Sequence, residues 1–188
     1  MKKYFYLLLI SILFISGCNG TEVKEDNIKD GDDEMNEYDI FDFSFINMAP
    51  EAEKKQPLNK VIKLYFSVGS IAENIEVAVD LGNGEIYKNP VLSTLGVDTF
   101  EDPVKAEDLN EIIAILEKYN VQDWKKDYTF ENPNSYLDGY SWSLMLQYED
   151  GTVEKHRGQG TKKGKITPEN FDGFLMELKK FVDERLGS

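Results

Sequence analysis

His156 is the only histidine in this 188-residue chain and its most obvious candidate for a general base. A histidine acts as a base when a carboxylate orients it and a nucleophile lies within hydrogen-bond reach. Ser141 and Ser143 are candidate nucleophiles, but nothing in the sequence places either of them beside His156. His156 also stands between Lys155 and Arg157 in a segment that we expect to be a hairpin strand. The sequence therefore favours a half-exposed strand histidine over a catalytic one.

Basic residues gather around this histidine in a chain that is otherwise acidic. The chain has 21 Lys and Arg against 35 Asp and Glu, which gives a formal net charge of −14. A local concentration of cations predicts a docking site for an anionic partner, such as teichoic acid, a glycan carboxylate or an acidic protein surface. The alternative is a solvated loop that balances the acidic body. The basic cluster consists of Lys155, Arg157, Lys162, Lys163 and Lys165.

Aromatic residues are dense in the same half of the chain and suggest a platform on which sugar rings could stack. The candidate platform is Trp124, Tyr140 and Trp142. However, Tyr140 and Trp142 alternate with serines along an expected strand, so both lie on its apolar face. Trp124 follows an expected helix, where residues that seal a core are common. Core packing is therefore the preferred interpretation.

The N-terminus carries a motif for covalent attachment to lipid. Lys2 and Lys3 precede Tyr4–Ile15, an apolar run shorter than the roughly 20 helical residues that span a bilayer and typical of a signal-peptide core. The run ends in Ile15-Ser16-Gly17-Cys18, which has the form of a lipobox, and Cys18 is the only cysteine. We expect cleavage before Cys18 and attachment of a diacylglycerol to its thiol. Two acyl chains, such as palmitate, give stable anchoring.

This motif and the composition together limit the classes of function. A lipid on Cys18 predicts a location at the outer face of a bacterial cell membrane, where ATP and NAD chemistry is not expected. Loss of Lys2 and Lys3 takes the net charge to −16, which argues against nucleic acid or an anionic membrane surface as a partner. One cysteine and one histidine exclude a disulfide and a Cys/His zinc site. The acidic run Asp30–Glu34 lacks the spacing of a calcium loop. We therefore predict no cofactor and no metal.

Three regions follow from the distribution of charge and hydrophobicity. Residues 1–17 form the signal peptide. Residues 18–57 hold twelve acidic residues and four lysines, and we expect a largely disordered tether that acts as a spacer. Within it, Ile40–Ile46 is rich in aromatic residues and is interpreted as an extra strand or as a partner-binding segment. Residues 58–188 form a single folded domain.

The pattern within this domain predicts an α+β fold, an antiparallel sheet of about five strands with two helices packed on one face. The expected element order is β-β-β-α-β-β-α. Turns at Gly82-Asn83-Gly84 and Glu149-Asp150-Gly151 join neighbouring strands into hairpins. Thr167 and Pro168 are expected to cap and begin the last helix. The predicted strands are 61–68, 74–81, 85–88, 139–148 and 152–157, and the predicted helices are 105–119 and the segment from 167 onward.

Three short motifs carry a resemblance to a known group of proteins: 138–142 (DGYSW), 148–151 (YEDG) and 168–171 (PENF). With Trp124, they resemble a domain of uncharacterised lipoproteins from Gram-positive bacteria, and the resemblance covers roughly residues 60–185. It implies a lipoprotein with this fold, and it implies no activity and no catalytic residue. The loop 158–165 is longer and more basic than the usual short link of that domain.

The sequence leaves three functions open for a domain held at the membrane surface. The first is a non-enzymatic module that binds an envelope protein or a cell-wall polymer. The second is a small hydrolase that uses His156 or a pair of acids. The third is an immunity or inhibitor protein, whose acidity would suit a cationic toxin or enzyme. We favour the first.

Overall fold

Strand β1 (Val61–Gly69) lies inside an antiparallel sheet because alternate side chains along it are apolar and pack beneath two helices. The computed structural model describes residues 43, 46–70, 74–92, 97–98, 102–130 and 139–187, which belong to a unit spanning residues 33–188. The predicted signal peptide, the lipobox and residues 18–42 of the predicted tether lie outside the described residues.

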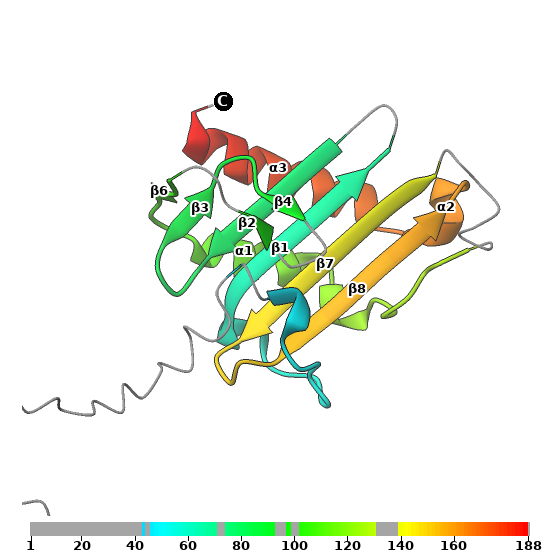
Figure 1. Cartoon of the computed structure of the whole chain (residues 1–188), viewed down its shortest axis with the longest axis horizontal. Coiled ribbons are helices and arrows are strands. Elements are labelled where there is room, and N and C mark those ends of the chain that lie inside the picture. Colours follow the sequence, from blue (N-terminus) through cyan, green and yellow to red (C-terminus); the bar gives the residue numbers. More distant parts are fainter. Residues whose placement is uncertain are drawn as a thin grey trace, which may run out of the picture. The chain divides into compact units, whose positions relative to one another are not determined.

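The sheet has six strands in the order β6-β3-β2-β1-β7-β8, and all neighbours are antiparallel (Figure 1). Both predicted hairpins are confirmed: Gly84 and Gly151 adopt positive φ in the turns after β2 and β7. A separate pair, β4 (Val91–Leu92) and β5 (Val97–Asp98), forms a two-stranded sheet. The other strands are β2 (Asn74–Asp80), β3 (Glu85–Tyr87), β6 (Val104–Lys105), β7 (Tyr140–Tyr148) and β8 (Val153–Gly160).

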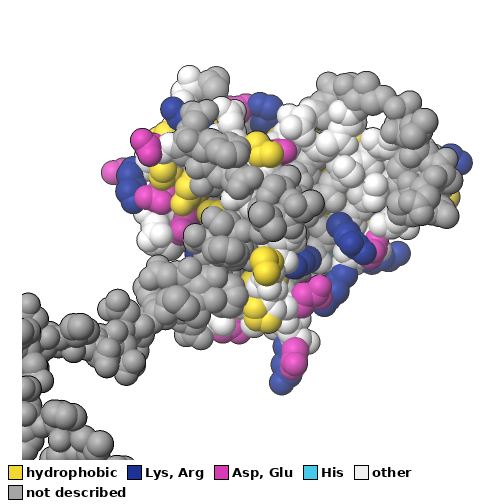
Figure 2. Space-filling model, viewed as in Figure 1, with side chains coloured by type: hydrophobic (Ala, Val, Ile, Leu, Met, Phe, Trp, Pro, Cys, Tyr) yellow, Lys and Arg dark blue, Asp and Glu magenta, His cyan; other side chains and the backbone are white. Residues whose placement is uncertain are grey.

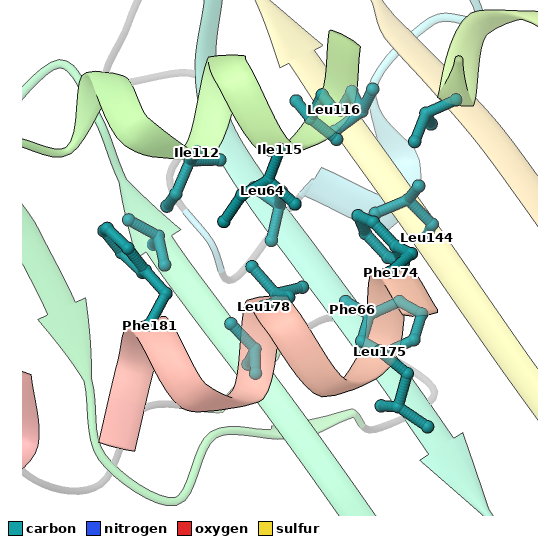
Figure 3. Close-up of a cluster of buried hydrophobic side chains, with 14 of the residues drawn as sticks. Leu64, Phe66, Ile112, Ile115, Leu116, Leu144, Phe174, Leu175, Leu178 and Phe181 are labelled. Carbon is teal, nitrogen blue, oxygen red and sulfur yellow. The ribbon is translucent and has the colours of Figure 1, made fainter. Parts of the chain in front are cut away.

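Two helices, α1 (Asn110–Lys118) and α3 (Phe171–Leu186), cover one face of this sheet. Their apolar sides meet the inward side chains of β1 and β7, with Phe174 and Leu178 of α3 and Leu116 of α1 fully buried (Figure 3). We call this the helix face. The short helix α2 (Lys163–Ile166) follows β8. Three 3-10 helices complete the described structure: η2 (Ile46–Met48), η3 (Leu58–Lys60) and η4 (Val121–Asp123).

The predicted α+β class is confirmed, with six strands in the sheet rather than five and a third helix, α2. The sixth strand, β6, has two residues and therefore shows no alternation in the sequence. The second residue of β6, Lys105, is the first residue of the helix predicted over 105–119. Asp108, with a φ of 59°, then separates β6 from α1.

The predicted start of the last helix is wrong. Thr167 ends α2, where its hydroxyl donates to the carbonyl oxygen of Lys163 at 2.9 Å, and α3 begins at Phe171. Asn170 occupies the N-cap position of α3, but its side chain bonds elsewhere, to Tyr119 and Trp124.

The opposite face of the sheet, which we call the outer face, is partly covered by the chain that precedes β1. Phe43, Ile46 and Ala49 are buried in a second apolar cluster with Tyr65 and Met145. Neither Phe43 nor Ile46 lies in the extra strand that the sequence suggested, since Ile46 begins η2 and Phe43 lies in a turn.

Residues beyond η2 reach the edge of β8. Val153 N–H donates to Pro50 O, and Ala52 N–H donates to Val153 O, both at 2.9 Å. The folded part of the chain therefore begins before the predicted boundary at residue 58.

Candidate functional site

The alternation of β7 and β8 divides the residues suspected of chemistry between the two faces of the sheet. Cross-strand partners share a face. Leu144 is paired with His156, and both face the helices, whereas Ser143 is paired with Arg157 on the outer face. Ser141 and Ser143 therefore point away from His156. No serine–histidine pair of the kind considered for a hydrolase forms from these residues.

Beyond the part of the outer face that Phe43, Ile46 and Ala49 cover, two rows of polar side chains cross the strands. Ser67 lies between Glu76 on β2 and Ser143 on β7, and Arg157 extends this row on β8. The next row is Asn74, Gly69, Ser141 and Gln159. Because these side chains are small or polar, this end differs from the apolar cluster beside it around Tyr65 and Met145.

Five members of these rows, together with Lys155, line a hollow of about 580 Å³, which we call the polar groove and define by Ser67, Ser141, Ser143, Lys155, Arg157 and Gln159. The N-terminal segment borders the groove with Asn47 and Glu51, and the segment after η4 borders it with Asp127 and Thr129. Figure 2 shows this face, with Lys and Arg side chains gathered toward its β8 side. The groove therefore combines residues from four separate parts of the sequence.

Arg157 is held in position by Asp127 although its side chain is 70% exposed. Its Nε and Nη2 donate to Asp127 Oδ2 at 3.0 and 2.8 Å. Asp127 Oδ1 in turn accepts from the backbone N–H of Thr129 at 2.6 Å. The hydrogen bonds from Thr129, with a further contribution from Arg157, hold the pKa of Asp127 below its ordinary value. Asp127 is therefore a stable anion that orients the guanidinium.

The other cations around the groove also have partners. Lys126 lies 3.3 Å from Glu51, and Lys155 Nζ donates to the neutral carbonyl oxygen of Asn47 at 2.7 Å. The groove thus offers oriented hydrogen-bonding groups, with carboxylates beside Arg157 and Lys126 and a positive charge on Lys155.

The structure divides the predicted basic cluster into two parts. Lys155 and Arg157 line the polar groove, whereas Lys162, Lys163 and Lys165 lie on and beside α2. Lys163 pairs with Asp172 at 2.7 Å and sits 5.3 Å from the ring centre of Tyr140. A single basic docking site across all five residues is therefore not formed.

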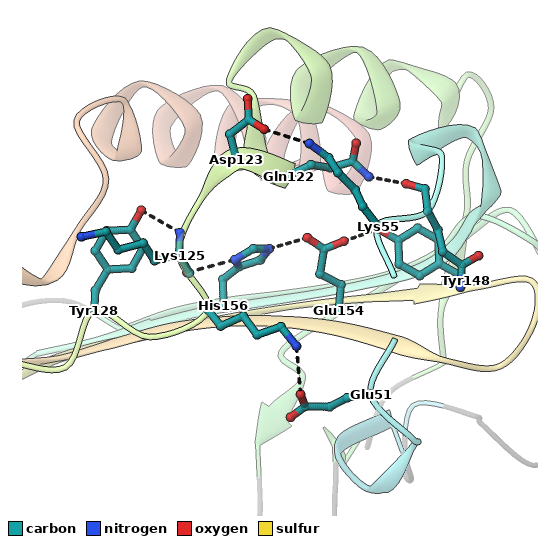
Figure 4. A network of polar contacts seen from close by, with 11 residues as sticks. Glu51, Lys55, Gln122, Asp123, Lys125, Tyr128, Tyr148, Glu154 and His156 are labelled. Atoms are coloured by element: carbon teal, nitrogen blue, oxygen red, sulfur yellow. Dashed lines mark hydrogen bonds and ion pairs between the residues drawn. The ribbon is translucent and has the colours of Figure 1, made fainter. Parts of the chain in front are cut away.

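His156 lies in a buried polar network on the helix face and not at a half-exposed position as the sequence suggested (Figure 4). It is 2% exposed, and Nδ1–H donates to the carbonyl oxygen of Lys125 at 3.1 Å. Nε2 lies 2.9 Å from Glu154 Oε1, and Tyr148 donates to Glu154 Oε2 at 2.5 Å. Both ring nitrogens are thus engaged, and the contact with Lys125 ties β8 to the segment after η4. This arrangement is that of a structural histidine.

The charge of Glu154 depends on these partners. Burial opposes its ionisation, but the hydrogen bonds from His156 and Tyr148 outweigh burial and hold the pKa of Glu154 below its ordinary value. Burial and the bond to Glu154 raise the pKa of Tyr148. Tyr148 is therefore a neutral donor to an ionised carboxylate.

The predicted aromatic platform is not a surface, because two of its three rings are in the core. Trp124 and Trp142 are 7% and 3% exposed and meet edge to face with ring centres 5.8 Å apart. Their indole nitrogens donate to Asn170 Oδ1 at 3.1 Å and to Ile166 O at 2.5 Å. Tyr140 is half-buried against the same core. The alternative of core packing is the one that the structure supports.

Sequence reasoning missed several residues of the groove and of the buried network. Ser67 and Gln159 could have been found as outward positions of strands, but only the cross-strand register places them in adjacent rows. Glu154 and Tyr148 lie six residues apart across a hairpin, and their contact follows from the turn that joins β7 to β8.

Two further findings concern the described residues as a set, and a third concerns the whole chain. No three of their histidine, cysteine and acidic side chains gather closely enough to hold a metal ion. None of the helices in these ranges is long and apolar enough to cross a bilayer. Comparison of the chain with protein-family models gives no match, and comparisons with curated proteins and with solved structures give none either.

Proposed function

We propose that this chain is a lipid-anchored, extracytoplasmic binding module whose polar groove holds a cell-wall glycan. The observation that carries the proposal is the groove itself, where strand register aligns hydroxyl, amide and guanidinium groups on the outer face. The anchor at Cys18 is taken from the sequence motif.

The chemistry of the groove favours a sugar chain over a strongly charged ligand. Serine hydroxyls donate and accept hydrogen bonds, and Gln159 does both through its amide, which matches the hydroxyl and acetamido groups of a glycan. Asp127 offsets the charge of Arg157, and the carbonyl oxygen of Asn47 orients Lys155, so the groove adds oriented donors with one positive charge in excess of that pair.

The length of the groove suits more than one sugar ring. Ser141, Ser143 and Met145 occupy successive outward positions of β7 and line the groove. At about 3.3 Å per residue, the distance from the first to the third is about 13 Å. A disaccharide or longer segment would span that distance.

A non-catalytic role is supported by the position of His156. Its two ring nitrogens contact Lys125 O and Glu154, and it faces away from the groove. A hydrolase at this site would need another base.

The proposal is tested by cosedimentation of the mature chain, with Cys18→Ser, with purified peptidoglycan sacculi. Ser143→Tyr fills the groove, and Arg157→Gln removes an oriented donor. We expect each to weaken binding about tenfold, the loss of about 1.4 kcal/mol of contact energy. Lys180→Gln on α3 is the matched loss of one positive charge and should leave binding within twofold. Absence of binding by the unmutated groove, or equal binding by Ser143→Tyr, would overturn the proposal.

A further inference from the structure

Acidic residues are distributed unevenly along this chain. None of its 35 Asp and Glu lies in 139–148 or in 155–168, the segments that form β7, most of β8 and α2. The second of these segments carries five Lys and Arg. These segments are therefore basic in a chain whose net charge is −14, and acids from other segments, Asp127 and Asp172, pair with Arg157 and Lys163.

Three lysines project from that end together with an aromatic side chain. Lys162, Lys163 and Lys165 are exposed, and Lys162 Nζ lies 6.0 Å from the ring centre of Phe130. Phe130 is 37% exposed, and it is among the large apolar residues that the described surface leaves open. We call these four residues the α2 patch.

The α2 patch is a projection and not a pocket. A Cβ atom added at Gly164, in the middle of α2, would have no neighbour within 4 Å. Lysine ammonium groups are mobile point charges without the fixed geometry that holds one discrete anion. A projecting set of lysines beside an exposed aromatic ring suits a broad, negatively charged surface with an apolar layer beneath it.

We propose that the α2 patch docks on the anionic headgroups of the membrane that carries the lipid anchor. The proposal rests on the anchor at Cys18 and is independent of the ligand in the polar groove. Attachment through Cys18 would raise the effective concentration of the headgroups at the patch, so a weak contact suffices.

The acidity of the rest of the chain does not prevent this contact. At physiological ionic strength the Debye length is about 8 Å, so acids elsewhere on the molecule are largely screened from the headgroups. Each lysine near an anionic surface strengthens the contact. Lys163 contributes less than the other two because it is paired with Asp172.

Docking at α2 would also orient the polar groove. Gln159 lies three residues before Lys162, so the Gln159 end of the groove would be nearest to the headgroups. The groove would then extend away from the membrane surface from its Gln159 end, and a glycan strand of the cell wall would approach it from the side opposite the membrane.

Vesicle sedimentation tests the proposal on the mature chain with Cys18→Ser, using phosphatidylcholine vesicles with and without 30% phosphatidylglycerol. We expect binding only to the anionic vesicles, weakening as salt rises. The triple variant Lys162→Gln, Lys163→Gln and Lys165→Gln should lose about tenfold in affinity. The matched control, with Lys54, Lys179 and Lys180 changed to Gln, should stay within twofold.

Two results would overturn membrane docking. One is absence of binding to anionic vesicles; the other is equal binding by the α2 triple variant and its control. A triple variant that loses binding to teichoic acid and keeps vesicle binding would assign the patch to a wall polymer instead. Ser143→Tyr should leave vesicle binding unchanged, so failure of the groove and failure of the patch give different results.

Discussion

Buried His156 connects β8 to the segment that orients Arg157. Lys125 accepts from His156, and two residues later Asp127 holds Arg157 in the groove. Glu154 completes the contact on the other side of the imidazole ring. A change at this pair should therefore act first on stability and only through it on the groove.

Replacement of Glu154 by Gln should lower the free energy of unfolding by about 2 kcal/mol at pH 7, because it removes a carboxylate that accepts two buried hydrogen bonds. The pKa of Glu154 is lowered in the folded state from an ordinary value of 4.5. Its contribution is therefore complete above about pH 4.5 and is lost as pH falls through the lower, folded-state pKa. Urea unfolding from pH 7 to pH 3 should show the two proteins converging at the acid end.

Glu149→Gln is the control, because Glu149 pairs with Lys60 at an exposed position. It should change stability by less than about 0.5 kcal/mol at every pH. A constant difference between Glu154→Gln and the unmutated protein down to pH 3 would show that the charge of Glu154 does not matter.

At the scale of elements, the junction between β8 and α2 depends on two glycines, because neighbouring atoms lie where a larger residue would have its Cβ atom. A Cβ at Gly158 would lie 2.1 Å from Ile166 O and 2.4 Å from Trp142 Nε1. A Cβ at Gly160 would lie 2.6 Å from Phe130 O. The predicted loop 158–165 is thus in part a strand, since Gly158–Gly160 belongs to β8.

Gly158→Ala should lower stability by more than about 2 kcal/mol, because the methyl group would displace Ile166 from the indole of Trp142. The loss of the Trp142 hydrogen bond should also shift the tryptophan emission. Gly164→Ala is the matched control: its methyl group meets nothing and alanine favours the helical conformation of α2, so stability should stay the same or rise by up to about 1 kcal/mol. Thermal unfolding followed by fluorescence measures both, and equal midpoints for the two variants would contradict this account of β8.

At the scale of the whole molecule, the part of the predicted tether nearest the domain belongs to the fold. Phe43, Ile46 and Ala49 bury Tyr65 and Met145, and backbone bonds join Pro50 and Ala52 to Val153. The outer face is therefore closed at one end by this segment and open at the other as the polar groove.

A chain that begins at residue 58 should consequently be less stable than one that begins at residue 33, the first residue of the unit. Loss of the buried Phe43 and Ile46 should cost about 3 kcal/mol, since burial of each side chain contributes about 1.5–3 kcal/mol and the exposed face relaxes in part. Urea unfolding of the two chains measures the difference. Equal midpoints and equal slopes would mean that residues 43–57 do not stabilise the domain.

Local patterns were sufficient to predict most of the sheet. The alternation of apolar and polar residues predicted β1, β2 and β7, and the glycine-containing turns predicted both hairpins. Strands and tight turns can be predicted in this way because they depend on neighbours in sequence. The stripe of apolar residues predicted α1 to within a few residues. The two-residue strand β6 and the start of α3 were not predicted, since backbone pairing and the side-chain contacts of Asn170 decide them.

The sequence alone determined the fold class, the two hairpins and the expectation of a lipid on Cys18, all of which depend on short runs of residues. Tertiary structure alone decided which chemistry is available. Strand register put Ser143 beside Arg157 and Leu144 beside His156, so the hydroxyls and the imidazole lie on opposite faces. It also put the tryptophans in the core and split the basic cluster between a groove and α2. These outcomes required tertiary structure because a shift of one residue in register exchanges the two faces of a strand.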